Sequence, residues 1–337
     1  MRGSVFPRAC LRYFTHSLML PVLESGEETL VGGQAVMEGV MMRAPHSYCV
    51  AVRKRSGEIV TEETTLARMS ERYPIFKVPV FRGMGTLFQA MKLGIRALQF
   101  SSNVFVEDEA QAECRKDPAA KPLKELPKWF LTVNLIVMVG SFLFLYKFLP
   151  LYLATLLGKH YLALDGRLAS NFVAGGIRIG ILLAFMFAMS RFKDFQRLFE
   201  YHGAEHKVVF NFESGQPVSV EAAQKFTTYH PRCGTSFLML LMIVSIVFYA
   251  FIPFNGFLPK LAMQIALLPW VVGVCYEMIR YAAKHPGGLL TVLTTPGLWL
   301  QRITTQPPSD PQTEVAVHAL DRAMSLEKAQ GGELVIA

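Results

Sequence analysis

The sequence predicts an α-helical integral membrane protein with about four transmembrane helices and a small α+β cytoplasmic region before them. Two observations lead to this fold class. The 337-residue chain is 52% hydrophobic and only 18% charged, whereas a soluble domain averages about 25% charged residues. Four stretches also approach the run of about 20 apolar residues that a helix needs to cross a bilayer.

The four predicted spans occupy residues 129–157, 171–190, 236–252 and 261–279. Lys147 and Pro150 interrupt the first span. Arg178 lies inside the second, which is unfavourable unless its guanidinium group faces protein or reaches the membrane interface. Pro269 predicts a kink in the fourth span.

Basic residues set the expected orientation, because cytoplasmic loops of membrane proteins are enriched in Lys and Arg. The first external loop offers only Lys159 and Arg167, and the second offers only Lys260. The segment between the second and third spans is much richer: Arg191, Lys193, Arg197, Lys207, Lys225 and Arg232. We therefore expect both termini in the cytoplasm and the chain in the inner membrane.

The net charge and the cysteine content limit which binding partners and which cellular compartment we expect for the chain. The net charge of +8 is explained by cytoplasmic loops, and no nucleic-acid-binding motif accompanies it. Membrane lipids and other membrane proteins are therefore the expected partners. The five cysteines are few, odd in number and scattered, which argues against a disulfide framework and favours a reducing compartment.

Five regions follow along the chain. Residues 1–29 are an N-terminal extension, 30–106 the small α+β region, 107–128 a linker, 129–306 the membrane domain, and 307–337 a tail helix. Within the α+β region we expect a β-hairpin turning at Ser56-Gly57. An amphipathic helix follows it, with Met91, Ile95 and Leu98 on one face. The loop at 191–235 would carry a cytoplasmic metal site.

The stretch "YHGAEHK" places His202 and His206 four residues apart. On a helix these positions share one face, so both imidazoles can bind one metal ion. Glu205 lies beside them and is positioned to act as a base on a bound water. The alternative is an interfacial helix whose histidines only form hydrogen bonds, and Gly203 is unfavourable within a regular helix.

The stretch "TYHPRCGTSF" adds His230 and Cys233 on a predicted tight turn. The alternative is a structural turn with a buried thiol. The two stretches lie on the same side of the membrane, and their ligand types suit zinc, with iron as the second choice. If all four side chains bind, the site is full and structural, whereas water in one position leaves it open for catalysis.

Several polar residues outside these stretches are further candidates. Glu38 is the only acid in "GGQAVMEGVMMRAP", so it needs Arg43 or a metal as a partner, or else it lies in a solvated turn. Glu277 lies near the end of the fourth span with Arg280 three residues later, which indicates a functional carboxylate, an ion pair or an interfacial position. Three arginines are candidates to bind an anionic group of a substrate: Arg43, Arg232 and Arg302.

Together, "GGQAVMEGVMMR", "YHGAEHK", "HPRCGTSF", "PGLWLQRITT" and "EVAVHAL" resemble the signatures of the YqhQ family. This is a bacterial membrane family of unknown function whose members are predicted to be metal-dependent enzymes. The resemblance runs from about residue 32 to residue 320 and supports the His/Cys positions and Glu205. It also implies roles for further residues: Gln34, Glu38, Arg43, Arg302 and Thr304-Thr305. It implies no substrate.

Three functions fit these observations. The first is a metal-dependent hydrolase at the cytoplasmic face, with Glu205 or Glu38 as the base, acting on a lipid, a lipid-linked molecule or a membrane peptide. The second is a scaffold or assembly factor with a structural zinc site. The third is a small transporter with Arg178 and Glu277 along its path, against which the lack of an inverted repeat counts.

Overall fold

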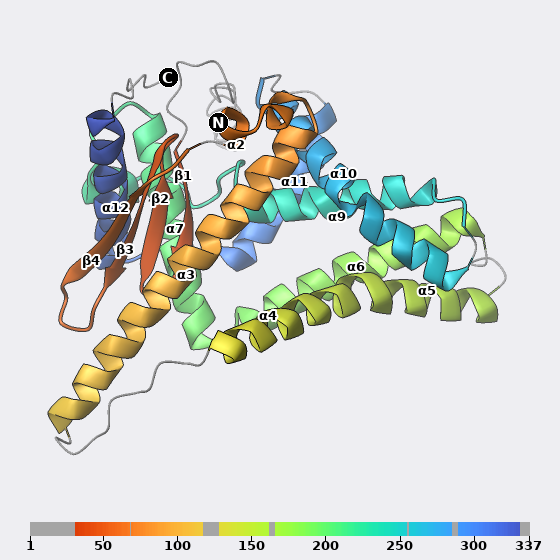
Figure 1. Cartoon of the computed structure of the whole chain (residues 1–337), viewed down its shortest axis with the longest axis horizontal. Coiled ribbons are helices and arrows are strands. Elements are labelled where there is room, and N and C mark those ends of the chain that lie inside the picture. The colour runs from red at the N-terminus through yellow and green to blue at the C-terminus, as the bar shows by residue number, and fades with distance from the viewer. Residues whose placement is uncertain are drawn as a thin grey trace, which may run out of the picture.

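A computed structural model of the chain describes residues 31–67, 69–116, 128–161, 166–254, 256–284 and 289–330. The predicted N-terminal extension lies outside the described residues. The molecule has two parts: a β-sheet with helices on both faces, and a set of long apolar helices beside it (Figure 1). The predicted combination of a helical bundle and a small α+β region is present.

Four antiparallel strands form the sheet in chain order: β1 (Gly32–Val36), β2 (Gly39–Arg43), β3 (Ser47–Arg53) and β4 (Ile59–Thr65). The predicted hairpin is the β3–β4 pair, with Arg53 opposite Ile59. The β1–β2 hairpin is an addition to the prediction, which assigned no strands to this segment and gave a solvated turn only as one alternative for Glu38. The sequence of β2 does not alternate between apolar and polar residues, because four of its five residues are buried, as in a strand covered on both faces.

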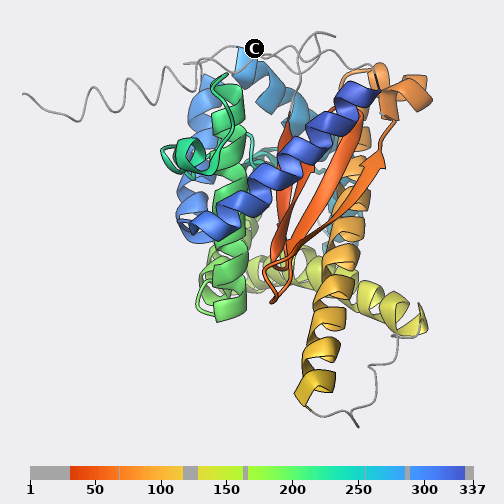
Figure 2. The ribbon, with the colours of Figure 1, turned by 90° about the vertical axis from the view of Figure 1, so that its left-hand side faces the viewer.

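Helices cover both faces of this sheet (Figure 2). They are α3 (Phe81–Lys116) on one face, and α7 (Lys193–Glu213) with α12 (Asp310–Ala329) on the other. Met41 and Val50 pack with Leu93 of α3, whereas Met42 and Cys49 pack with α7 and α12. Three distant segments therefore build one α+β unit, and the expected metal-site loop and tail helix are parts of it.

The connection from the sheet to α3 consists of α2 (Met69–Arg72) and the 3₁₀-helix η1 (Pro74–Lys77). The predicted amphipathic helix is present but runs to Lys116, into the expected linker, because 107–116 is rich in helix-forming residues. The predicted apolar face points outward: Met91 is 58% exposed, while Leu93 and Ala97 are buried against the sheet.

In the described residues, the apolar part of the chain contains six further α-helices and one π-helical segment. They are α4 (Lys128–Leu143), the π-helix η2 (Phe144–Phe148), α5 (Leu149–His160), α6 (Arg167–Met189), α9 (Gly234–Ala250), α10 (Phe257–Lys284) and α11 (Leu289–Thr304). Within that part of the chain, three helical stretches are long and apolar enough to cross a membrane: Ile136–His160, Leu168–Met189 and Phe257–Ala282. Their large apolar side chains point outward, as Ile136 at 65% and Phe172 at 60% exposure illustrate.

The predicted third span corresponds to α9, which has 17 residues and would measure only about 25 Å. That is shorter than the hydrocarbon core of about 30 Å. Instead of lining the outside, α9 packs against α6, α10 and α11. The structure therefore has three helices of spanning length and one shorter apolar helix among the residues it describes.

The packing of α12 on the sheet predicts a large loss of stability for Leu320→Ala. Leu320 is 2% exposed within the cluster shared by the sheet, α7 and α12, so the cavity should cost about 2–5 kcal/mol. Thermal melting in detergent is the measurement. Leu258→Ala, at a residue that is 75% exposed, is the matched control and should melt as the wild type does. Equal melting of the two variants would contradict this packing.

Candidate metal centre

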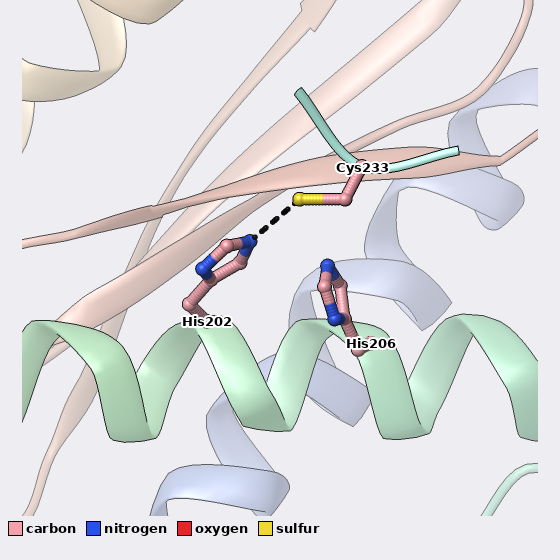
Figure 3. Close-up of side chains that lie close together, drawn as sticks. All are labelled: His202, His206 and Cys233. Carbon is pink, nitrogen blue, oxygen red and sulfur yellow. Dashed lines mark hydrogen bonds between the residues drawn. The ribbon is translucent and has the colours of Figure 1, made fainter. Parts of the chain in front are cut away.

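Helix α7 carries the two histidines of "YHGAEHK". Its helical period places Tyr201, Ala204 and Val208 in the core shared with the sheet. His202 and His206 project from successive turns toward Cys233 (Figure 3). The predicted shared face is therefore realised on a continuous helix.

Gly203 lies within this helix because a neighbouring backbone comes very close. A Cβ atom on Gly203 would lie 2.0 Å from the carbonyl oxygen of Gln306. The backbone N–H of Gln306 donates to the carbonyl of Phe199 at 3.0 Å, so the chain after α11 runs directly along α7. The glycine permits this approach and does not interrupt the helix.

Cys233 is the N-cap residue of α9, and its Sγ accepts a hydrogen bond from the backbone N–H of Thr235 at 3.4 Å. The turn before it is held by Gln301 of α11. The Gln301 side chain accepts from the backbone N–H of His230 at 2.8 Å and donates to the carbonyl of His230 at 2.7 Å. The thiol is thereby fixed at a helix N-terminus, where the helix dipole favours a thiolate.

One ligand atom each from His202, His206 and Cys233 lies within 4.8 Å of the others. Nε2 of His202 is 3.2 Å from Sγ of Cys233 (Figure 3). Tetrahedral zinc with ordinary Zn–N and Zn–S bonds would separate such atoms by about 3.5 Å. Nε2 of His206 is buried and has no hydrogen-bond partner, so its lone pair or proton is available to a ligand.

Backbone carbonyls orient both imidazoles. Nδ1 of His202 lies 2.8 Å from the carbonyl oxygen of Thr304, and Nδ1 of His206 lies 2.5 Å from that of Thr228. A carbonyl can only accept, so each Nδ1 carries a proton, and Nε2 is the ring nitrogen left for a metal ion. This second shell is typical of metal-binding histidines.

The electrostatics favour the protonation states that metal ligands need. Burial lowers the pKa of His206, and the neighbouring Cys233 partly offsets that effect. Burial alone would raise the pKa of Cys233, but the neighbouring His206 outweighs it, and the thiol pKa is below its ordinary value.

Glu205 lies beside the three ligand atoms. Its Oε2 is 3.5 Å from Nε2 of His206 and 4.0 Å from Nε2 of His202. Burial raises the carboxyl pKa, and His202 partly offsets that effect. Strand β1 packs on the stem of this side chain, because a Cβ on Gly33 would lie 2.6 Å from Cγ of Glu205. The "GGQAVMEG" segment therefore contributes to the site through its backbone.

His230 lies next to the group of three but outside it. Its ring centroid is 5.6 Å from that of His206, and its Nε2 is 3.4 Å from Oε2 of Glu213. Arg232 also forms an ion pair with Glu213. Glu213 thus holds both residues, and the predicted four-ligand set is found as three grouped side chains and one neighbour.

The structure places the other candidates away from the three ligand atoms. Glu38 pairs with Arg197 and accepts from the hydroxyl of Tyr201 at 3.3 Å. The partner expected for Glu38, Arg43, donates instead to Gln89 at 3.1 Å.

Glu277 forms an ion pair with Arg82 at 2.5 Å and accepts from the backbone N–H of Val80 at 3.3 Å. It thereby fastens the start of α3 to α10. Gln34 packs against Gly94 of α3, and Arg302 is exposed on α11.

Sequence reasoning missed most of the residues that orient the ligands and named only Thr304 among them, through the family resemblance. The carbonyls of Thr228 and Thr304, the side chain of Gln301 and the carboxylate of Glu213 all hold a predicted ligand in place. Only the "WLQRITT" stretch contained a signal for them, through its resemblance to a family motif.

Comparisons with known proteins show the family to which the chain belongs. The family model described as "Protein of unknown function (DUF1385)" matches residues 78–326. The chain is also 31% identical over 302 residues to the Bacillus subtilis (strain 168) protein "Uncharacterized protein YqhQ", covering 88% of this chain and 92% of that one. The chain belongs to the DUF1385 family, as its resemblance to YqhQ predicted. No solved structure matches it.

The close approach at Gly203 predicts that Gly203→Ala damages the site. The added methyl group would collide with the carbonyl of Gln306, so α7 must shift, at a cost on the order of 2 kcal/mol. The melting temperature would therefore fall. Gly180→Ala is the matched control, because a Cβ at Gly180 meets nothing within 4 Å. An unchanged melting temperature in Gly203→Ala would contradict the prediction.

Proposed function

We propose that the protein is a metal-dependent membrane enzyme in which His202, His206 and Cys233 hold a zinc ion. The observation that carries this proposal is the convergence of their ligand atoms within 4.8 Å of one another. Two oriented imidazoles and a thiol suit zinc, and iron is the second choice.

An open coordination position favours catalysis over a purely structural site. Three grouped protein ligands leave the fourth position of a tetrahedral zinc for water or substrate. His202 and Cys233 are each partly exposed, whereas His206 is 1% exposed. A small molecule can therefore approach from the side of His202 and Cys233.

The chemistry that fits such a site is hydrolysis. Bound zinc would lower the pKa of a water molecule and polarise a substrate oxygen. Oε2 of Glu205 lies close to both imidazole nitrogens, and its raised pKa suits a group that takes up and returns a proton. Glu38 is engaged by Arg197 and Tyr201, so the proposal assigns the base role to Glu205.

The position of the site in the chain suggests the substrate class. Cys233 directly precedes the apolar helix α9, and α7 follows the spanning-length helix α6. Three helices have spanning length, and α12 packs on the N-terminal sheet, so both terminal regions lie on one side and α9 must cross as a shorter fourth segment. Because the segment between the second and third predicted spans is basic, we place the site at the cytoplasmic face of the inner membrane, with both termini in the cytoplasm. Lipids, lipid-linked molecules and membrane peptides reach that depth.

A structural zinc site in a scaffold protein is the second candidate. The observation favouring it is the position of His230, whose ring centroid lies 5.6 Å from that of His206. A rotation of His230 away from Glu213 would supply a fourth protein ligand and close the site. In that case Glu205 would have no role in chemistry.

The first test is metal content. Purified protein should contain about one zinc ion per chain by mass spectrometry of the metal, and chelation should lower its melting temperature. His206→Ala should lose the metal, whereas His318→Ala, on α12 and outside the site, should keep it. With cobalt in place of zinc, Cys233→Ser should abolish the thiolate charge-transfer band. Well-folded wild type without any metal would rule out both candidates.

The second test separates the two candidates through Glu205→Gln. With zinc bound, this variant should lower the hydrolysis of p-nitrophenyl phosphate or p-nitrophenyl butyrate by about 100-fold or more, because the proton acceptor is lost. Zinc content and melting temperature should be retained. Glu200→Gln, on the same helix, is the control. If the zinc-bound wild type hydrolyses neither probe and its cobalt form shows four protein ligands, the scaffold candidate stands.

A further inference from the structure

Two basic side chains lie inside the apolar helices, far along the chain from the metal ligands. Lys147 of η2 is 4% exposed and Arg178 of α6 is 3% exposed. Both face the same aromatic ring of α9: Nζ of Lys147 is 4.6 Å and Cζ of Arg178 is 5.3 Å from the ring centroid of Tyr249. Two positive groups are thus buried next to each other.

The hydrogen-bond partners of both groups are neutral. Arg178 donates to the carbonyl of Tyr146 at 2.9 Å, to the hydroxyl of Ser245 at 3.2 Å and to the side-chain carbonyl of Gln264 at 3.4 Å. Lys147 donates to the hydroxyl of Tyr249 at 2.5 Å. No carboxylate among the described residues forms an ion pair with Lys147 or Arg178.

These contacts leave hydrogen-bonding capacity unused. An ammonium group has three N–H donors and a guanidinium group has five, and four of these eight form the bonds given above. Unused donors and unneutralised charge are both strongly unfavourable in a buried apolar setting. A small anion between the two groups would satisfy both requirements.

The local backbone is shaped around this position. Lys147 lies in a π-helical turn, a rare geometry that is common at functional sites. The neighbouring residue Tyr146 supplies the carbonyl that Arg178 binds. The wide turn therefore brings a cation and a carbonyl acceptor into the interior together.

Polar side chains continue from here toward the end of the bundle where α6 and α10 begin (Figure 1). Lys260 lies one turn before Gln264 on α10, and Asn171 lies two turns before Arg178 on α6, so each shares a face with its partner. Lys260 is 8% and Asn171 4% exposed. Further buried polar groups therefore lie on the side of the two residues that faces that end of the bundle.

We infer that Lys147 and Arg178 form a binding site for a small monovalent inorganic anion, with chloride as its simplest occupant. The site lies among η2, α6, α9 and α10, near the end of α9 opposite Cys233. It does not depend on the metal centre, because it shares no residue with it.

The test compares chloride with gluconate, a much larger organic anion, at constant ionic strength and pH. Wild-type protein in detergent should melt at a higher temperature in chloride, with saturable dependence, because a ligand of the folded state stabilises it. Equilibrium dialysis with radioactive chloride should give about one ion per chain. Lys147→Met should abolish both effects, and Lys147→Arg should retain them. Lys159→Met, an exposed lysine on α5, is the control.

The dialysis measurement on wild type requires no variant, so it decides the question even if Lys147→Met does not fold. Identical melting in the two salts together with no bound chloride would overturn the inference. A chloride effect that persists unchanged in Lys147→Met would overturn it as well, because the ion would then bind elsewhere. Zinc content should be the same in both salts, which separates this site from the proposed metal centre.

Discussion

The close packing of α7 between the sheet and the chain after α11 is the constraint on which the candidate site depends. Gly33 brings β1 onto the stem of Glu205, and on the opposite side of the helix Gly203 admits the carbonyl of Gln306. A helix held this closely on two sides cannot rotate without collision. His202 and His206 are therefore held in one direction before any ligand binds.

The groups around the site come from different parts of the chain that meet only in the folded molecule. The imidazoles come from α7, the thiol from the start of α9, and the orienting carbonyls from Thr228 and Thr304. Burying a polar group without a partner is also unfavourable among the apolar helices, where the buried groups are basic donors. The candidate metal centre presents buried acceptors that would suit a cation, while Lys147 and Arg178 present buried donors that would suit an anion.

Much of the fold could be predicted because its signals are local. Long apolar runs indicated the helices of the bundle, alternation around Ser56-Gly57 indicated the β3–β4 hairpin, and the tail helix expected within 307–337 is α12. The β1–β2 hairpin was missed because β2 is buried on both faces and does not alternate. The placement of α7 and α12 on the sheet was also missed, because helical periodicity shows that a face is apolar but not what covers it.

For the candidate site, the sequence by itself determined which groups are able to bind a metal ion or a proton: the histidines of "YHGAEHK", the thiol of "HPRCGTSF" and the carboxylate of Glu205. Spacing on one helix was enough to place His202 and His206 together. Only the tertiary structure decided that Cys233 joins them, that His230 turns toward Glu213, and that Glu38 pairs with Arg197. These choices depend on contacts between residues far apart in the chain, where packing and charge pairing, and not local propensity, determine the partner.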